Sequence, residues 1–165
     1  MVKRSPQVTA PLTVEQYLAR EGTSKVGYEY VAGEIFAMSP VSPRHSTITF
    51  NIRHHLREAT RSKGCRMFGD VLTKVAEDPF YYPDVVITCA PLGPSDIVVS
   101  PRFVVEVTSP STRTTDLREK PLAYRSAPSM QGILIAEQNR RHVISHTRKR
   151  RRPLVPRRPD RHRDH

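Results

Sequence analysis

The amino-acid sequence predicts an α/β domain with a mixed central β-sheet flanked by helices. Its 165 residues suit one domain that can bury most of a core. Two runs in the middle of the chain, 81–88 and 103–108, are rich in β-branched residues and are typical of buried strands. Segments with helical spacing stand on both sides of these runs, which favours the α/β class.

The first third of the chain predicts a short helix and a hairpin. Thr13 and Gln16 form a capping box, which starts a helix that runs to about Arg20. Residues 28–31 and 34–38 are expected to be two strands joined by a tight turn at Ala32-Gly33.

A long helix should follow this hairpin. Ser42 is placed to cap it, Pro43 suits its first position, and Gly64 is the expected stop. Four apolar residues recur along one stripe of this helix and should face the core: Ile48, Ile52, Leu56 and Ala59.

The remaining elements alternate between strands and one helix. Short strands are expected at 66–68 and 71–76, before the two central runs. A helix is expected over 115–126, followed by strands at 132–136 and 142–147.

The net charge of +11 belongs mainly to the C-terminal end of the chain. Residues 140–165 carry eleven Lys or Arg and two Asp, whereas the other residues carry sixteen basic and fourteen acidic side chains. A segment of this kind can bind phosphates electrostatically. Because its composition cannot bury enough apolar surface, we expect a basic disordered tail at 148–165, a flexible N-terminus at 1–10 and a folded domain at 11–147.

Cysteine use and hydropathy predict a soluble, cytoplasmic protein. Cys65 and Cys89 are too few for a disulfide framework and lack zinc-ligand spacing, so we interpret both as reduced thiols. No apolar segment follows the basic N-terminus, so no signal peptide is expected. No apolar run approaches membrane-spanning length, so a membrane is not an expected partner.

Asp84 and Glu106 each lie inside one of the two apolar runs. A buried carboxylate is costly unless it is paired, protonated or bound to a metal. Two such acids on consecutive strands can meet at one sheet edge and hold a hard divalent cation. Asp116, Lys120 and Tyr124 share one face of the next helix, which can bring the lysine near them. The alternative interpretation is a buried ion pair between Lys120 and one of the acids that only holds the fold.

Other polar candidates rank lower. His45, near the start of the long helix, either positions a phosphate or is a solvated or capping histidine. His54 and His55 are adjacent, so they point to different faces and are expected at the surface. Tyr124 is expected to pack in the core.

Five motifs follow one another between about residue 11 and residue 145. In this order they resemble the motifs of the Uma2 family, restriction-endonuclease-like proteins with the PD-(D/E)xK nuclease fold. The resemblance implies that fold and metal-dependent cleavage of DNA phosphodiester bonds. The motifs are LTVEQYL at 12–18, YEYVAGEI at 28–35, MSP at 38–40 with His45, YPDVV at 82–86 and VEVTSPST at 105–112.

The resemblance also implies roles for individual residues. Asp84 and Glu106 match the two acids of the family and would bind Mg²⁺, or Mn²⁺ in its place, with the Val107 carbonyl as a third ligand. Thr108 stands where the fold usually has a lysine, and Lys120 resembles its replacement on the following helix. Glu34 resembles an accessory acid at the entrance of the site.

These residues make a Mg²⁺-dependent endonuclease acting on DNA the first function hypothesis. Nucleases of this fold that cut both strands commonly act as dimers, so the resemblance also suggests a homodimer. The alternative is a non-catalytic nucleic-acid-binding protein, a degenerate nuclease fold that binds through its basic tail.

Two departures from the family bear on activity. Pro121 directly follows Lys120, and a proline inside a helix costs about 3 kcal/mol and makes the direction of the lysine uncertain. Arg/Pro/His-rich sequence takes over near His146, where relatives continue with strands and a closing helix. We hypothesise that this segment is an out-of-frame reading of GC-rich DNA, which predicts a poorly stable and weakly active protein.

Overall fold

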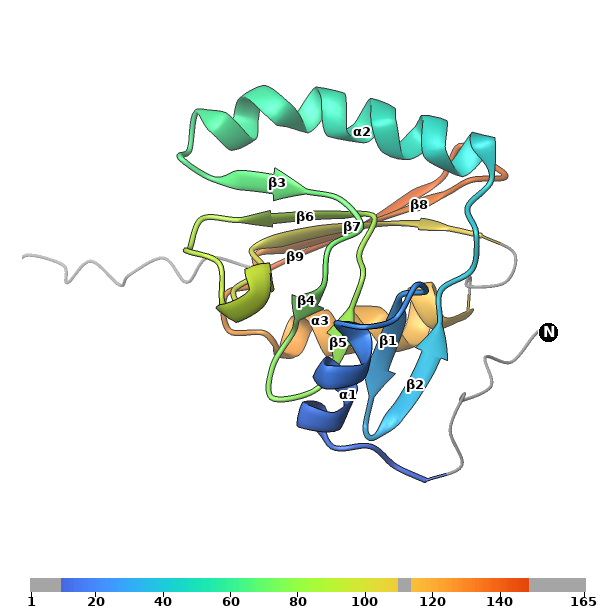
Figure 1. The fold of residues 1–165 in the computed structure, drawn as a ribbon. Coiled ribbons are helices and arrows are strands. Elements are labelled where there is room, and N and C mark those ends of the chain that lie inside the picture. The colour runs from blue at the N-terminus through green and yellow to red at the C-terminus, as the bar shows by residue number, and fades with distance from the viewer. Residues whose placement is uncertain (1–9, 110–113, 149–165) are drawn as a thin grey trace, which may run out of the picture.

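A five-stranded sheet forms the centre of the molecule (Figure 1). The structure is a computed structural model that describes residues 10–109 and 114–148. The strand order is β3-β6-β7-β8-β9, and the β7–β8 pair is parallel while the other pairs are antiparallel. The predicted mixed central sheet is therefore confirmed. Its strands are β3 (Arg66–Phe68), β6 (Val85–Thr88), β7 (Phe103–Thr108), β8 (Gly132–Glu137) and β9 (Val143–Thr147).

A second, antiparallel sheet was not expected from the sequence. Its order is β2-β1-β5-β4, and it holds the predicted hairpin at its edge. Ala32 and Gly33 both have positive φ, 49° and 88°, as a tight two-residue hairpin turn requires. Helix α1 (Val14–Glu21) starts at the predicted capping box and packs on this sheet around Tyr17. The strands are β1 (Tyr28–Val31), β2 (Glu34–Ala37), β4 (Thr73–Lys74) and β5 (Phe80–Tyr81).

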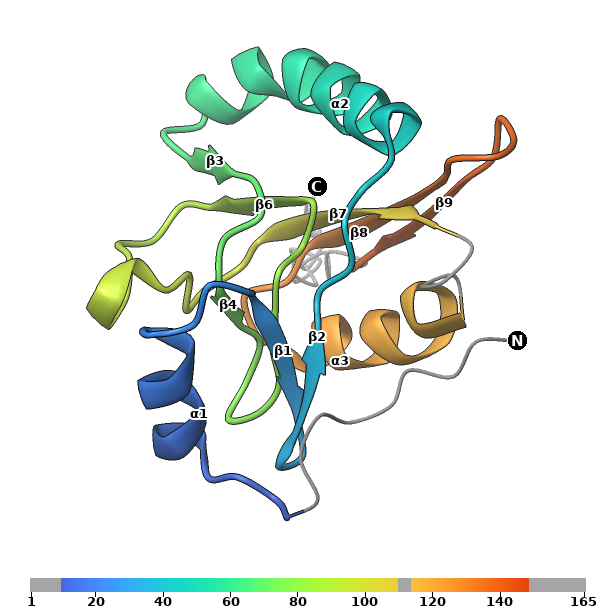
Figure 2. The same ribbon diagram turned by 45° about the vertical axis from the view of Figure 1, so that its right-hand side comes forward.

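Helix α2 (Pro43–Arg61) crosses one face of the large sheet (Figures 1 and 2). Ser42 caps it by accepting the backbone N–H of His45, as predicted. The face turned to the sheet overlaps the expected one only in part, because its buried residues are His45, Thr49 and Thr60. In the predicted apolar stripe Ile48, Ile52 and Leu56 are half-buried and Ala59 is exposed.

Helix α3 (Lys120–Ser126) covers the opposite face of the large sheet (Figure 2). It is preceded by a wider π-helical turn over Thr115–Glu119, so Pro121 lies in the first turn of α3. In this turn the backbone N–H of Lys120 donates to the Thr115 carbonyl, five residues back, and the widened turn accommodates the proline without ending the helix. Lys120 is consequently held in place and buried.

Cys65 and Cys89 form a disulfide, so their interpretation as reduced thiols is wrong. The register of β3 with β6 pairs Arg66 with Thr88. The same register continued by one residue puts the two cysteines opposite each other, with Cα atoms 4.1 Å apart. The sequence lacked this information because strand register depends on tertiary contacts.

The two chain ends fall largely outside the described residues. The predicted flexible N-terminus (1–10) and basic tail (148–165) lie outside the described residues except for Ala10 and Arg148. Arg148 is bonded into the domain: its backbone N–H donates to the Gln131 carbonyl at 2.9 Å. In the described ranges no helix is long and apolar enough to cross a membrane.

Candidate active site

The fold brings Asp84 and Glu106 opposite each other. The β6–β7 register pairs Val85 with Val105, so Asp84, the residue just before β6, comes next to Glu106 of β7. Both side chains are buried, with 8% and 4% of their residue surface exposed. The pairing of β6 with β7 therefore places the two acids opposite each other at the same end of these strands, as predicted.

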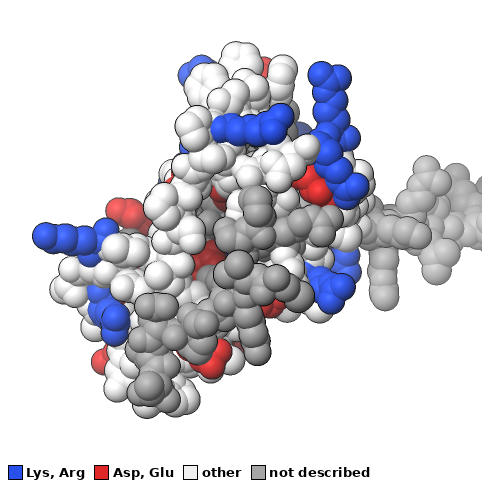
Figure 3. All heavy atoms as spheres, turned by 90° about the vertical axis from the view of Figure 1, so that its right-hand side faces the viewer, with Lys and Arg blue, Asp and Glu red and all other residues white. Residues whose placement is uncertain are grey.

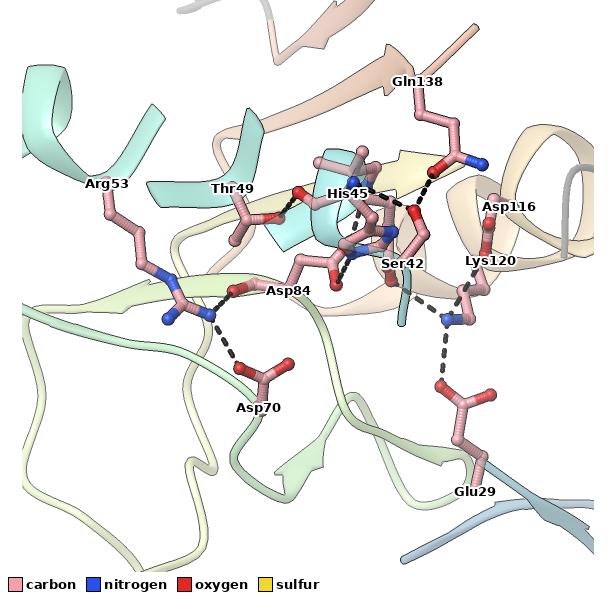
Figure 4. Close-up of polar contacts among 12 residues, drawn as sticks. Glu29, Ser42, His45, Thr49, Arg53, Asp70, Asp84, Asp116, Lys120 and Gln138 are labelled. Atoms are coloured by element: carbon pink, nitrogen blue, oxygen red, sulfur yellow. Dashed lines mark hydrogen bonds and ion pairs between the residues drawn. The ribbon is translucent and has the colours of Figure 1, made fainter. Parts of the chain in front are cut away.

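Lys120 lies at the centre of three buried carboxylates (Figure 4). Its Nζ is 2.9 Å from Glu29 Oε1, 3.2 Å from Glu106 Oε1 and 3.4 Å from Asp116 Oδ1. Asp116 precedes Lys120 by one helical turn, whereas Glu29 comes from β1 and so ties the small sheet to the large one. Tyr124, one turn further along α3, donates its O–H to Glu106 Oε1 at 2.5 Å.

The acids of this cluster outnumber the cation. Burial raises the pKa of Glu106 well above its usual value, and the nearby carboxylates add to the effect of burial while Lys120 opposes it. Burial lowers the pKa of Lys120, but Glu106, Glu29 and Asp116 outweigh burial and raise it well above the usual range. The ammonium group is therefore charged at neutral pH, and it faces three buried carboxyl groups.

Asp84 is fixed by contacts from α2 and β7. One carboxylate oxygen lies 2.8 Å from Nε2 of His45, and the other accepts the backbone N–H of Val107 at 2.6 Å. The Asp84 carbonyl accepts from the guanidinium of Arg53, which also bonds Asp70 (Figure 4). His45 is itself positioned by the Ser42 cap. The carboxylate of Asp84 is thus fixed before any ligand arrives.

The structure brings some of the predicted site residues together and leaves one apart. Glu106 and Lys120 form an ion pair, Asp84 stands opposite Glu106 in the strand register, and Val107 contacts Asp84 through its N–H. Glu34 is exposed at the turn end of the hairpin, where it pairs with Val31. It lies two residues, or about 7 Å, along β2 from Phe36, the residue that pairs with Glu29. The structure therefore does not bring Glu34 to the cluster.

Two residues of the cluster were missed or ranked low from the sequence. Glu29 lies in an aromatic and β-branched strand, the same signal that selected Asp84 and Glu106. His45 was left open between a phosphate contact and a solvated or capping residue, and the structure shows it buried against Asp84. His54 and His55 are exposed, as predicted.

The donor set suits a hard divalent cation in charge and in chemistry. Carboxylate oxygens are the ligands that Mg²⁺ and Mn²⁺ prefer, and the excess of buried acids favours a further positive charge. Among the described residues, however, no three His, Cys, Asp or Glu side chains already converge as a metal site. The Glu106–Lys120 ion pair of the alternative interpretation is present, and it is only one contact of a larger acidic cluster.

The His45–Asp84 contact predicts a pH dependence of stability. The hydrogen bond to Asp84 raises the pKa of His45 above its usual value, although burial opposes this. The contribution of the charged pair is therefore fully present below about pH 6.5, the pKa of an unfolded histidine, and is lost as pH rises through the folded pKa.

Denaturant melts in EDTA at several pH values measure this loss. We expect His45→Gln to flatten the fall in unfolding free energy above about pH 6.5. The matched variant His54→Gln, at an exposed site on the same helix, should keep the wild-type pH dependence. Equal slopes in wild type and His45→Gln would refute the charged pair.

Comparisons with known proteins agree with this fold. The chain is 31% identical over 140 residues to the uncharacterised protein slr1290 of Synechocystis sp., covering 82% of this chain and 74% of that protein. It is 29% identical over 136 residues to sll1609 of the same organism, covering 79% and 77%. A crystal structure from Anabaena variabilis, titled a putative nuclease belonging to DUF820, matches with a TM-score of 0.72 and 17% identity over 83% of this chain and 80% of that one.

The family assignment rests on most of the chain. The pattern of the Uma2 family, described as "Putative restriction endonuclease", matches residues 14–162. This match extends past residue 145, further than the motifs alone indicated. The out-of-frame hypothesis begins at about His146, and most of the residues it concerns lie outside the described part of the chain, so it stays a hypothesis. With its mixed sheet and a match over residues 14–162, this chain belongs to the Uma2 family.

Proposed function

We propose that this protein is a metal-dependent nuclease that hydrolyses phosphodiester bonds of DNA. The observation that carries the proposal is the buried excess of carboxylates around Lys120, where Asp84 lies opposite Glu106. Membership of the Uma2 family supports it, since that family is described as "Putative restriction endonuclease".

In this proposal Asp84 and Glu106 would hold the divalent cation, Mg²⁺ or Mn²⁺. Such a cation lowers the pKa of a bound water and stabilises charge on phosphate oxygens. The protein's part is to fix the donors: His45 and the Val107 N–H hold the carboxylate of Asp84 from two sides. His45 is thereby a positioning residue, because it acts through Asp84.

Lys120 supplies the fixed positive charge of the site. Glu29 and Asp116 hold its ammonium group, and the raised pKa keeps it protonated at neutral pH. A buried, protonated ammonium can donate a hydrogen bond to a water or to a non-bridging phosphate oxygen, and its charge acts strongly because water is excluded. Its task is therefore to orient the reacting groups and to stabilise developing negative charge.

A plasmid cleavage assay tests the proposal. Purified protein is incubated with supercoiled DNA in Mg²⁺, in Mn²⁺ and in EDTA, beside Asp84→Asn prepared in the same way. We expect cleavage only with metal, and a loss of at least about 10²-fold in Asp84→Asn, because removing one preorganised charged group costs this much. Cleavage that persists in EDTA, or that is equal in the variant, would refute a metal site at Asp84.

The second candidate is a non-catalytic nucleic-acid-binding protein. The observation that favours it is the concentration of charge in residues 140–165. It predicts DNA binding that needs no divalent metal, weakens steeply with salt and disappears when residues 149–165 are deleted. Metal-dependent cleavage that survives this deletion would exclude it.

A further inference from the structure

Exposed arginines lie on the first turn of α2 and at the β8–β9 turn, two elements that meet at the end of the sheet that carries Glu106. Figures 1 and 2 show the β8–β9 hairpin projecting past the N-terminal end of α2. The Ser42 hydroxyl, which caps α2, donates to Oε1 of Gln138 at 3.2 Å, just after the end of β8. The turn and the helix end are therefore held together above the site, as Figure 4 also shows.

The β8–β9 turn is braced by a buried acid. Glu137 accepts two hydrogen bonds from the guanidinium of Arg140, at 2.6 and 2.8 Å, and lies 3.1 Å from Nδ1 of His142. Glu137 pairs with Thr108, two residues past Glu106 on the same face of β7. The guanidinium of Arg140 is thus bonded within the turn. Its neighbour Arg141 is exposed and lies at the same end of the sheet as the carboxylates.

Among the described residues, Arg44 has no acidic partner in its own helical turn. It is exposed on the first turn of α2, and that turn carries no acidic residue. The positive end of a helix dipole disfavours a cation in the first turn, whereas Arg61 in the last turn of the same helix is favoured. Residues that are placed unfavourably for stability, as this arginine is, are expected at functional positions.

The site itself creates a need for these cations. A nucleic-acid strand is polyanionic, and the buried carboxylates of Glu29, Asp84, Glu106 and Asp116 repel it. Figure 3 shows acidic side chains in the middle and at the edge of this side of the molecule, and Lys and Arg side chains that project at its periphery. Positive charge at the rim offsets the repulsion where the phosphates next to the scissile one must pass.

We propose that Arg44 and Arg141 bind phosphates of the nucleic-acid strand next to the cleavage position, on the side where α2 and the β8–β9 turn meet. The proposal rests on the proposed nuclease function and specifies its substrate: an extended strand rather than an isolated phosphodiester. The two arginines contact backbone phosphates, so they add affinity without reading sequence. The surface they form is distinct from residues 149–165.

The test measures binding separately from cleavage. Fluorescence anisotropy of labelled single-stranded and duplex oligonucleotides is recorded in EDTA over a series of salt concentrations. Each of Arg44→Gln and Arg141→Gln should weaken binding several-fold and reduce the slope of log K against log salt by about 1, the value for one lost phosphate contact. Arg61→Gln, an exposed arginine at the other end of α2, should leave both unchanged.

The outcomes separate this proposal from the function proposed above. Weaker binding with a lower slope in both variants supports the surface even if the wild type cleaves nothing. Slopes equal to that of the wild type in both variants overturn it, whatever the cleavage assay gives. Binding that vanishes on deletion of residues 149–165 also overturns it, because the affinity then belongs to the tail.

Discussion

Replacing Lys120 by methionine should destabilise the fold by about 3–5 kcal/mol at neutral pH, the usual cost of leaving buried charges uncompensated. The ammonium group is the shared partner of Glu29, Glu106 and Asp116, all of which are buried. Methionine has a similar volume, so the loss reports charge rather than packing. Chemical denaturation gives the free energy of unfolding, and the exposed Lys63→Met is the matched control.

The pH dependence of the Lys120→Met variant identifies the cause. Without the lysine, the pKa of Glu106 rises further above its unfolded value. A group with a raised folded pKa keeps its proton in the folded state while the unfolded state loses it, so stability falls as pH rises above about 4.5. The deficit relative to wild type should therefore be smaller at pH 5 than at pH 7.5.

A double variant separates the charge effect from packing. Adding Glu106→Gln to Lys120→Met removes one of the uncompensated acids, so part of the lost stability should return. A deficit that is independent of pH and is not relieved in the double variant would show that Lys120 stabilises the protein only through its methylene groups.

The local elements were predictable because their signals lie close together in the sequence. The Thr13–Gln16 capping box and the Ser42 cap each need only a few neighbouring residues, and both appear as expected. The π-helical turn before Lys120 was missed because a regular α-helix was assumed around Pro121. Strand register, and with it the pairing of Cys65 with Cys89, depends on contacts between distant segments.

The residues of the candidate site also differ in how far the sequence alone could predict them. Asp84, Glu106 and Lys120 could be selected because an acid in an apolar run and helical spacing are local patterns. The contact of Glu29 with Lys120 depends on how the small sheet packs on the large one, which no local pattern specifies. The place of Glu34, exposed at the hairpin end, likewise depends on the direction in which the hairpin points.

Replacing Glu106 by glutamine should separate activity from stability. Cleavage should fall by about 10²–10³-fold, because a neutral amide neither binds a hard cation well nor balances its charge. The unfolding free energy at neutral pH should stay within about 1 kcal/mol of wild type or rise, because glutamine keeps the acceptor for the Tyr124 hydroxyl and Lys120. The substitution also removes a buried acid whose raised pKa opposes folding at this pH.

This pair of measurements distinguishes the two interpretations of the buried cluster. If Glu106 served only as the structural partner of Lys120, its loss would cost about 3–5 kcal/mol and would affect cleavage only through unfolding. Glu58→Gln, at an exposed position of α2, should change neither quantity. Since two other carboxylates still hold Lys120 in the variant, we expect a folded, stable and inactive protein, as a buried acid kept for catalysis requires.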